Sequence, residues 1–214
     1  MRNLLRNTTE LAQALCREYI DEFRKEGGEL NAVDATCGNG HDTLWLAKLC
    51  DRVYAFDIQS EAIEATAQLL SESNISFCRR AAGECEAGNE KQVSQVSVEL
   101  ICDSHENMKK YVSKQAAIVV FNLGYLPGTD KTVTTTADST IEALEKALDL
   151  LGINGLLCVT VYWGHDEGKA ERTAVLEWAK TLDSSAYHCV HTDMLNQPNC
   201  PPEILLVTKK KPTA

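Results

Sequence analysis

Aspartates and glycines stand where the strand-like segments of this sequence end. The stretch VDATCGNGHDT carries Asp34 just before a turn with Gly38 and Gly40, and the segment RVYAFDIQ ends near Asp57. Glycines let a backbone pass close to a ligand, and an acid at the end of the next strand can accept hydrogen bonds from ribose hydroxyls. The pattern predicts a nucleoside site, although a two-glycine turn alone is equally compatible with a tight structural connection.

The residues of the turn favour one class of nucleoside. A dinucleotide site normally has a third glycine for close helix packing, and Thr43 occupies that position here. Asp34 would repel a pyrophosphate and attract a cation. We therefore predict S-adenosylmethionine as cofactor, with S-adenosylhomocysteine as product. The predicted cofactor-binding residues are Asp34, Thr36, Gly38, Asn39, Gly40, Asp42, Thr43, Asp57, Ile58, Gln59, Asp103, Ser104, His105 and Asn122.

Asp103 ends the next strand-like segment, VSVELICDSH. Together with Ser104 and His105 it is expected near the adenine. The alternative is that Asp103 caps the short helix predicted over ENMKKYV, and both roles are compatible with the sequence.

The elements that must position these residues alternate along the chain. Apolar residues at helical spacing predict a first helix from Asn7 to about Arg24, and helical patterns separate the strand-like runs that follow. Two such runs, YHCVHTDML and EILLVTKK, close the chain without a helix between them and predict an antiparallel hairpin. We expect a doubly wound α/β fold, Rossmann-like, with a seven-stranded, mostly parallel sheet in one domain over residues 1–214. The run ISFCRR could be a strand, and most of the segment from about residue 76 to 97 is interpreted as an insertion.

Composition narrows the function further. The net charge of -10 argues against broad, nonspecific nucleic-acid binding. The longest apolar runs fall short of a bilayer span and no signal peptide is recognisable, so we expect a cytoplasmic protein without membrane contact. The nine cysteines form no CxxC pair and no cluster with zinc-ligand spacing, which favours reduced thiols and no metal.

Five segments carry a family resemblance. In this order, DATCGNGHDT, VYAFDIQ, NLGYLPGTDK, YWGHDEGKAE and QPNCPPEILLV resemble the small bacterial class I methyltransferase family once labelled as rRNA methylases, over nearly the whole chain. Characterised members of that family methylate the amine of 5-aminomethyl-2-thiouridine at the wobble position of transfer RNA. The resemblance implies the class I methyltransferase fold, 5-methylaminomethyl-2-thiouridine as product, and the tRNA anticodon stem-loop as partner. A homodimer is compatible with it. The segment around residues 76–97 and Cys200 depart from the family pattern.

The resemblance also implies roles at the reacting end of the site. The segment NLGY is similar to the Asn-Pro-Pro-Tyr box of amino-methylating enzymes, so Asn122 is expected to position the amine and Tyr125 to flank the base. His165 is a candidate base because imidazole titrates near neutral pH, but a structural role stays open. Tyr162 and Trp163 could stack on an unpaired base, and since neighbouring strand residues face opposite sides, one of them is expected in the core.

Three other functions remain open at this point. A small-molecule N-methyltransferase would suit the acidic composition better than an RNA-modifying enzyme. An NAD-dependent oxidoreductase is disfavoured by the two-glycine turn and by the terminal hairpin. A noncatalytic binding module could use the same fold as a scaffold.

Overall fold

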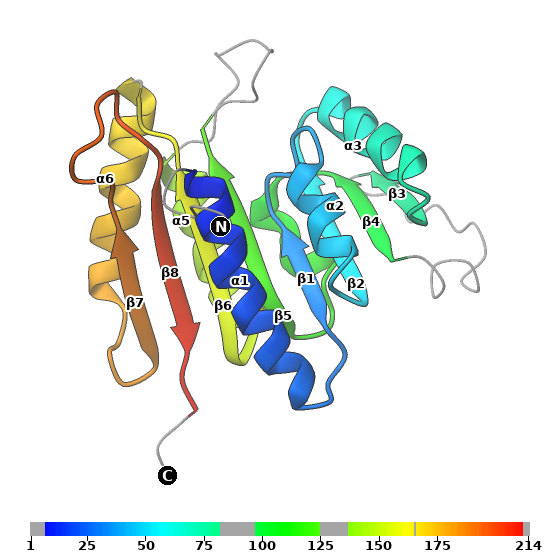
Figure 1. Cartoon of the computed structure of the whole chain (residues 1–214), viewed down its shortest axis with the longest axis horizontal. Coiled ribbons are helices and arrows are strands. Elements are labelled where there is room, and N and C mark those ends of the chain that lie inside the picture. Colours follow the sequence, from blue (N-terminus) through cyan, green and yellow to red (C-terminus); the bar gives the residue numbers. More distant parts are fainter. Residues whose placement is uncertain (1–6, 82–96, 125–136, 165, 212–214) are drawn as a thin grey trace.

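The computed structural model of this chain describes residues 7–81, 97–124, 137–164 and 166–211. Within these residues the strands form one eight-stranded sheet, in the order β3-β4-β2-β1-β5-β6-β8-β7 (Figure 1). The strands are β1 (Asn31–Asp34), β2 (Arg52–Asp57), β3 (Phe77–Ala81), β4 (Val98–Cys102), β5 (Ala116–Leu123), β6 (Leu151–Val161), β7 (Tyr187–Thr192) and β8 (Glu203–Lys209).

The pairing of the strands confirms the predicted mixed sheet. Strands β1 to β6 pair in parallel, whereas β8 is antiparallel to both β6 and β7. The predicted count of seven strands was wrong, because β3 adds an eighth strand beside β4. The segment predicted as an insertion therefore begins with a strand of the sheet, and its residues 82–96 lie outside the described residues.

The short strand β3 confirms that ISFCRR contains a strand, although two arginines interrupt its apolar pattern. Arg80 pairs with Glu99 of β4 at 3.1 Å, and Arg79 pairs with Glu64 at 2.8 Å. Charges on a short edge strand discourage pairing with another chain. The arginines are thus compatible with the edge of a sheet.

Helices cover both faces of the sheet. Side chains of α1, α2 and α3 pack in one hydrophobic cluster, whereas η2, α5 and α6 contribute to the cluster on the opposite face. In Figure 1 the helices α1, α2 and α3 lie on the near side of the sheet. The helices are α1 (Thr8–Lys25), α2 (His41–Ala47), α3 (Ser60–Glu72), the 3-10 helix η2 (His105–Lys110), α5 (Ala137–Leu150) and α6 (Asp166–Thr181). In the described part of the chain, each helix is too short or too polar to span a bilayer.

The amino end of α1 agrees with its prediction. The helix begins after Asn7, whose side chain accepts a hydrogen bond of 2.9 Å from the backbone N–H of Thr9. Its buried residues Ala12, Cys16 and Ile20 recur at helical spacing and face the sheet. This packing places the first turns of α1 over β5 and β6.

The centre of the sheet contains the point where the strand order reverses. Strand β1 lies between β2 and β5, with Asp34 opposite Ala55 on one side and Val120 on the other. Ligands of doubly wound folds bind outside the carboxyl ends of the strands at such a point. The turn after β1 and the end of β5 at Asn122 therefore border the same crevice.

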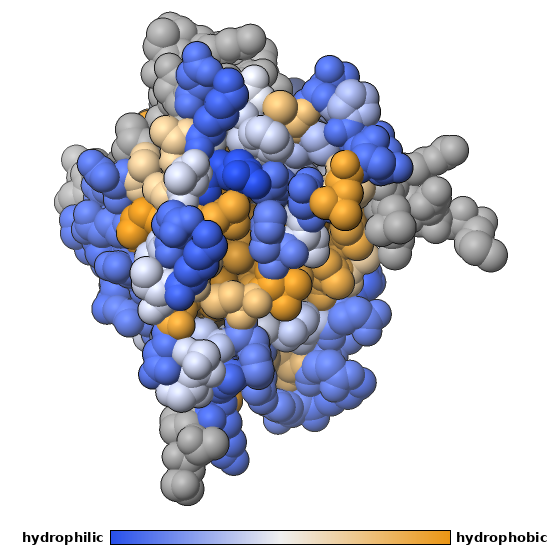
Figure 2. Space-filling model, turned by 90° about the vertical axis from the view of Figure 1, so that its left-hand side faces the viewer, coloured by the Kyte–Doolittle hydropathy of each residue, from blue (hydrophilic) through white to orange (hydrophobic). Residues whose placement is uncertain are grey.

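The opposite edge of the sheet is formed by β7, which is mostly exposed to solvent. Figure 2 shows this side of the molecule, where hydrophilic residues surround hydrophobic ones. Val190 of β7 and Leu195 of the following loop are exposed apolar residues. Of the two histidines on β7, His188 and His191, the second binds the carboxylate of Glu203 at 2.7 Å.

Candidate active site

The turn between β1 and α2 is shaped by its contact with α3. Gly38 and Gly40 have φ angles of 52° and 80°, which L side chains rarely adopt. A Cβ atom on Gly40 would lie 2.8–2.9 Å from atoms of Thr66, while the Thr66 hydroxyl donates a hydrogen bond of 3.0 Å to the carbonyl of Gly38. Glycine at position 40 is therefore a packing requirement of the turn.

Asp57 joins the end of β2 to this turn. Its two carboxylate oxygens accept hydrogen bonds of 3.0 Å from the backbone N–H groups of Gly38 and Gln59. Burial raises the pKa of Asp57, and these backbone hydrogen bonds oppose that rise. Because each carboxylate oxygen has two lone pairs, the group retains acceptors for ribose hydroxyls.

Two predicted cofactor residues beside Asp57 and the turn are open to solvent. The side chain of Ile58 is 59% exposed, although it is large and apolar, and Asn39 is exposed in the turn. An exposed apolar side chain next to an acceptor for ribose suits the flat face of an adenine. Gln59 is half-buried and contributes its backbone N–H to Asp57.

Asp34 and Thr43 lie beneath the turn, with no exposed surface on either residue. The Thr43 hydroxyl donates to Asp34 at 2.6 Å, and the backbone N–H of Thr36 donates to the same carboxylate at 3.3 Å. Burial, followed by the charge of Asp42, raises the pKa of Asp34 to about 7. In this arrangement Asp34 and Thr43 support the turn and have no surface with which to contact a ligand. Attraction of a cationic ligand by the charge of Asp34 does not require contact and stays a prediction.

Asp103 stabilises its own loop. It accepts hydrogen bonds from the backbone N–H of Ser104 at 2.7 Å, from Asn107 at 2.9 Å and from the hydroxyl of Tyr111 at 2.8 Å. Burial alone would raise the pKa of Asp103, but the hydrogen bonds outweigh it and the pKa is lowered. The predicted capping role is not observed, because the N-cap residue of the 3-10 helix η2 is Ser104 and no described side chain accepts a hydrogen bond from a backbone N–H within η2. Contact with the adenine stays a prediction for Asp103 and for the half-buried Ser104.

His105 is buried against the strands and makes an edge-to-face contact with Phe121, with ring centroids 5.7 Å apart. Burial lowers the pKa of His105, and a backbone hydrogen bond to Ala35 opposes that effect. Its Nε2 atom has no hydrogen-bond partner in the part of the chain that the structure describes. The neutral imidazole therefore packs as a core residue beside the crevice.

Asn122 is fixed at the carboxyl end of β5 by two neighbours. Its backbone N–H donates a hydrogen bond of 2.7 Å to the hydroxyl of Thr36, and its side-chain amide donates one of 2.7 Å to Asp42. Asp42 also accepts a hydrogen bond of 2.7 Å from Gln13 of α1. The three predicted residues Thr36, Asp42 and Asn122 are thus brought together, and Gln13 is an addition that the sequence did not predict.

The aromatic pair after β6 divides as predicted. Trp163 packs against the core, donates a hydrogen bond of 3.0 Å from Nε1 to the carbonyl of Pro201, and stacks with Arg172 at 4.9 Å from its ring centroid. Tyr162 is 39% exposed, and its backbone N–H donates to the carbonyl of Leu123 at 3.0 Å. Tyr162 is therefore the aromatic side chain available beside the end of β5. The candidates Tyr125 and His165 lie outside the described residues.

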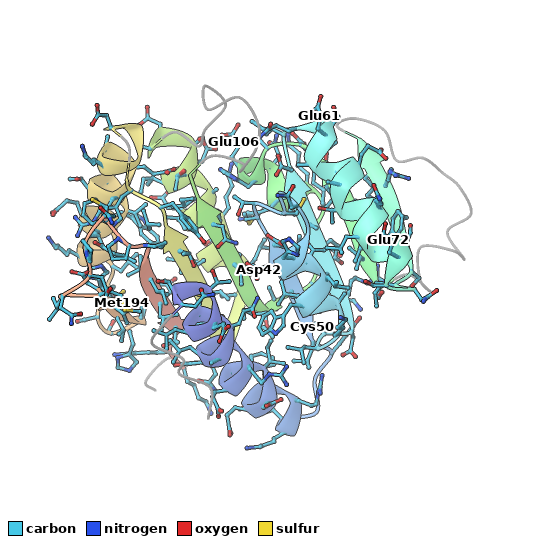
Figure 3. All side chains as sticks on the ribbon, turned by 45° about the horizontal axis from the view of Figure 1, so that its top comes forward. Asp42, Cys50, Glu61, Glu72, Glu106 and Met194 are labelled. Carbon is cyan, nitrogen blue, oxygen red and sulfur yellow. The ribbon has the colours of Figure 1, made fainter. Side chains whose placement is uncertain are left out.

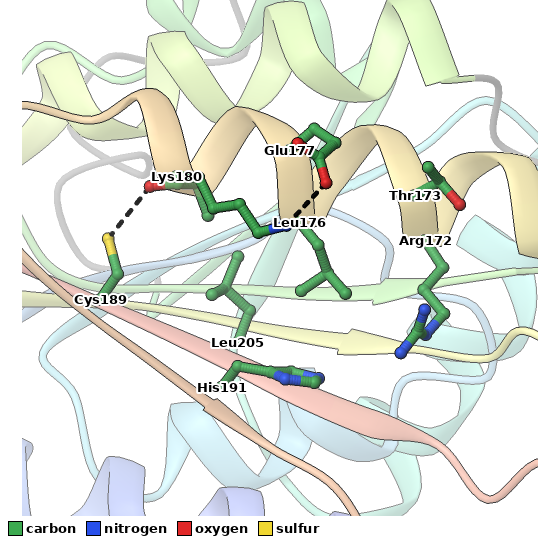
Figure 4. A pocket seen from close by; sticks show the side chains of 9 residues that line it. Arg172, Thr173, Leu176, Glu177, Lys180, Cys189, His191 and Leu205 are labelled. Carbon is green, nitrogen blue, oxygen red and sulfur yellow. Dashed lines mark hydrogen bonds and ion pairs between the residues drawn. The ribbon is translucent and has the colours of Figure 1, made fainter.

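A second groove, of about 520 Å³, lies between α6 and the β7–β8 hairpin (Figure 4). Ionisable residues that line this groove bind other residues of the protein itself. Arg172 and His191 both bind Glu203, and Lys180 binds Glu177 at 2.7 Å. Strands β5 and β6 separate this groove from the turn after β1. The groove is thus distinct from the crevice that holds the predicted site residues.

Comparisons with known proteins identify the family of this chain. A sequence model of the family described as "Putative rRNA methylase" matches residues 53–208. The chain is 34% identical over 206 residues to the "tRNA (mnm(5)s(2)U34)-methyltransferase, chloroplastic" of Arabidopsis thaliana, covering 92% of this chain and 67% of that protein.

Two solved structures are similar over nearly their whole length. A "putative rRNA-methylase" from Clostridium thermocellum is 35% identical with a TM-score of 0.79, covering 95% of this chain and 97% of that one. A "putative methyltransferase" from Streptococcus mutans, solved in complex with S-adenosylhomocysteine, is 34% identical with a TM-score of 0.74, covering 92% and 96%.

Proposed function

Because this chain belongs to the family described as "Putative rRNA methylase", we propose that it methylates the aminomethyl nitrogen of 5-aminomethyl-2-thiouridine at the wobble position of transfer RNA. The chain is a methyltransferase whose cofactor is S-adenosylmethionine. The amine as acceptor and the wobble uridine as substrate are the proposed part. The tRNA methyltransferase of Arabidopsis thaliana, to which the chain is 34% identical, supports that part.

The crevice after β1 has residues that fit the cofactor. Asp57 retains acceptor capacity for the ribose, and Ile58 offers an apolar face for the adenine. Gly38 and Gly40 give the turn between them its positive φ angles of 52° and 80°. The bound cofactor supplies an electrophilic methyl group on a sulfonium, and the protein must hold a nucleophile in line with it.

Asn122 carries the proposal that the acceptor is an amine. Its side chain stands at the end of β5, and no described residue donates a hydrogen bond to its carbonyl oxygen Oδ1. Such an oxygen can accept a hydrogen bond from an amine N–H and so orient the nitrogen lone pair towards the methyl group. An ammonium has no lone pair, so the nitrogen must be bound in its neutral form or lose a proton first.

The exposed side chain of Tyr162 supports the proposal that the amine belongs to an unpaired base. RNA recognition commonly stacks unstacked bases on aromatic side chains, and Tyr162 lies beside the end of β5. The net charge of -10 leaves only local contacts to supply phosphate affinity. An anticodon loop, which presents unpaired bases, is therefore a more suitable substrate than a long duplex.

The test is a methylation assay with two tRNA substrates. The purified protein is incubated with labelled S-adenosylmethionine and either tRNA that carries 5-aminomethyl-2-thiouridine or the same tRNA with unmodified uridine, and nucleosides are analysed. We expect 5-methylaminomethyl-2-thiouridine from the first substrate alone. Methylation of a small amine without any methylated nucleoside would contradict the proposal and favour a small-molecule N-methyltransferase.

A further inference from the structure

Two side-chain amides converge on the carboxylate of Asp42. Gln13 Nε2 donates a hydrogen bond of 2.7 Å to Oδ1 of Asp42, and Asn122 Nδ2 donates one of 2.7 Å to Oδ2. The three side chains come from α1, α2 and β5, and Figure 3 labels Asp42 between α1 and α2. They also line one small crevice beneath α1. The network therefore connects the first helix of the chain to the predicted amine-binding residue.

The chemistry of the carboxylate determines how both amides are turned. An ionised carboxylate only accepts hydrogen bonds, whereas each amide has a donor end and an acceptor end. A rotation of the Asn122 amide by 180° would bring its oxygen against the oxygen of Asp42. The bond from the Asn122 backbone to Thr36 at 2.7 Å holds the main chain in place. Asp42 thus permits only the orientation in which Oδ1 of Asn122 faces away from it.

We propose that Asp42, held in turn by Gln13, is a positioning residue that fixes the Asn122 amide with its carbonyl oxygen presented to the substrate amine. The inference rests on the proposed function, because it assumes that Asn122 receives an amine. It assigns Gln13 a role in turnover and gives Asp42 a role beyond cofactor contact. Neither residue needs to touch the substrate.

The orientation of Asn122 matters during the transfer itself. The nitrogen lone pair forms the new N–C bond while the C–S bond breaks and its electron pair goes to sulfur. The positive charge passes from sulfur to nitrogen, and the methylated nitrogen then gives up a proton to solvent water. A carbonyl oxygen at the nitrogen stabilises this charge, whereas an amide NH₂ group in its place would oppose it. A flipped Asn122 amide is therefore expected to slow the methyl transfer and to leave the affinity for the cofactor unchanged.

The direction of these hydrogen bonds can be changed by substitution. If Asp42 and Gln13 had only a structural role, the direction of the bonds would not affect turnover. In Asp42→Asn, residue 42 has one acceptor and one donor end, so either orientation of Asn122 can be matched. Adding Gln13→Glu supplies an acceptor for the NH₂ group of the residue at position 42. The side-chain oxygen at position 42 then faces Asn122 and accepts a hydrogen bond from its NH₂ group. Adding Gln13→Lys supplies a donor and turns the NH₂ group towards Asn122, which favours the flipped amide. On the Asp42→Asn background, the two second substitutions are therefore expected to turn the Asn122 amide in opposite directions.

The assay measures kcat and KM with tRNA that carries the aminomethyl group, at saturating S-adenosylmethionine. We expect Asp42→Asn to lower kcat about tenfold, the addition of Gln13→Glu to restore it to within about threefold of the wild type, and Gln13→Lys to lower it about 100-fold. Gln68→Glu on the Asp42→Asn background is the matched control. It adds the same charge on the exposed surface of α3, where Gln68 binds only Glu72, and is expected to restore nothing.

A second measurement separates this inference from the proposed substrate. The side-chain NH₂ signals of Asn122, identified with Asn122→Ala, are followed by NMR in the full-length protein with S-adenosylhomocysteine. We expect slow hydrogen exchange of these protons in the wild type and in the Gln13→Glu double variant, and fast exchange in the Gln13→Lys double variant. Failure of the wild type to methylate the tRNA would contradict the proposed function alone. Equal exchange rates or equal kcat values in the two double variants would overturn the positioning role.

Discussion

The hydroxyl of Thr43 donates a hydrogen bond of 2.6 Å to the carboxylate of Asp34, and both residues are completely buried beneath the turn that follows β1. Burial and the charge of Asp42 raise the pKa of Asp34 from 3.8 to about 7. The unfolded chain therefore loses this proton at a lower pH than the folded protein. Stability derived from the neutral acid is fully present below about pH 4 and is lost as the pH rises to about 7.

We predict that Asp34→Asn removes this loss of stability. An asparagine fits the site, because its oxygen can accept from the backbone of Thr36 and its NH₂ group can donate to the Thr43 hydroxyl. At about 1.4 kcal/mol per pH unit, the interval from 3.8 to about 7 corresponds to roughly 4 kcal/mol. Urea unfolding from pH 4 to pH 8 should show the variant gaining stability relative to the wild type as the pH rises.

Asp149→Asn is the matched control for that experiment. Asp149 is exposed and pairs with Lys109 at 2.9 Å, so its replacement should change stability by less than about 1 kcal/mol. A constant stability difference between Asp34→Asn and the wild type across this pH range would show that the buried carboxyl does not titrate as described.

Gly40→Ala should destabilise the protein through two separate effects. The φ angle of 80° is unfavourable for alanine, and the added Cβ would lie 2.8–2.9 Å from Thr66. Gly27 has a φ angle of 78° but no heavy atom within 4 Å of an added Cβ, so Gly27→Ala measures the backbone effect alone. We expect a loss of about 1–2 kcal/mol for Gly27→Ala and about 1–3 kcal/mol more for Gly40→Ala in urea unfolding. Equal losses would argue against the contact with Thr66.

Local patterns were sufficient to predict most of this fold. Asp57 and Asn122 end apolar strands in the sequence, and parallel strands bring such ends to one edge of the sheet. The hairpin of β7 and β8 was also evident, because no helical pattern separates the two runs. The sequence left strand β3 open as one possibility for ISFCRR, because its ion pairs with Glu64 and Glu99 form only after folding.

The site was less predictable where side chains depend on distant neighbours. Nothing near Asp34 in the sequence indicates that this residue is completely buried and accepts a hydrogen bond from Thr43. Gln13 lies 29 residues before Asp42 and on a different helix, and no local pattern marks their contact. The only signal is that Thr9, Gln13 and Cys16 lie along one stripe of α1.

Asp57→Ala is predicted to weaken cofactor binding before it affects turnover. The substitution removes the acceptor for the backbone N–H groups of Gly38 and Gln59, together with the proposed acceptor for the ribose. Calorimetric titration with S-adenosylhomocysteine should show an affinity about 10- to 100-fold lower. Unchanged affinity would remove Asp57 from the cofactor site.

Asn122→Ala is predicted to have the reverse effect. Its side chain is bound to Asp42 and has no hydrogen bond to the glycine turn, so cofactor affinity should change less than about threefold, whereas kcat should fall about 100-fold. Single-turnover methylation at saturating cofactor measures the second quantity. Equal losses of affinity and kcat would mean that Asn122 binds the cofactor instead of positioning the amine.

Substitutions of Tyr162 and Trp163 should distinguish an effect on RNA binding from an effect on stability. The side chain of Tyr162 is exposed, whereas that of Trp163 packs against the core. Trp163→Ala removes core packing, the hydrogen bond to Pro201 and the contact with Arg172, which should cost about 3 kcal/mol of unfolding free energy. Tyr162→Ala removes an exposed ring and should change stability by less than about 0.5 kcal/mol.

If a base stacks on that ring, the affinity for an anticodon stem-loop should fall about 5- to 100-fold in Tyr162→Ala. Fluorescence anisotropy at fixed salt measures this affinity, and wild-type affinity in Tyr162→Ala would exclude stacking on Tyr162, because the exposed ring has no other role in the described site.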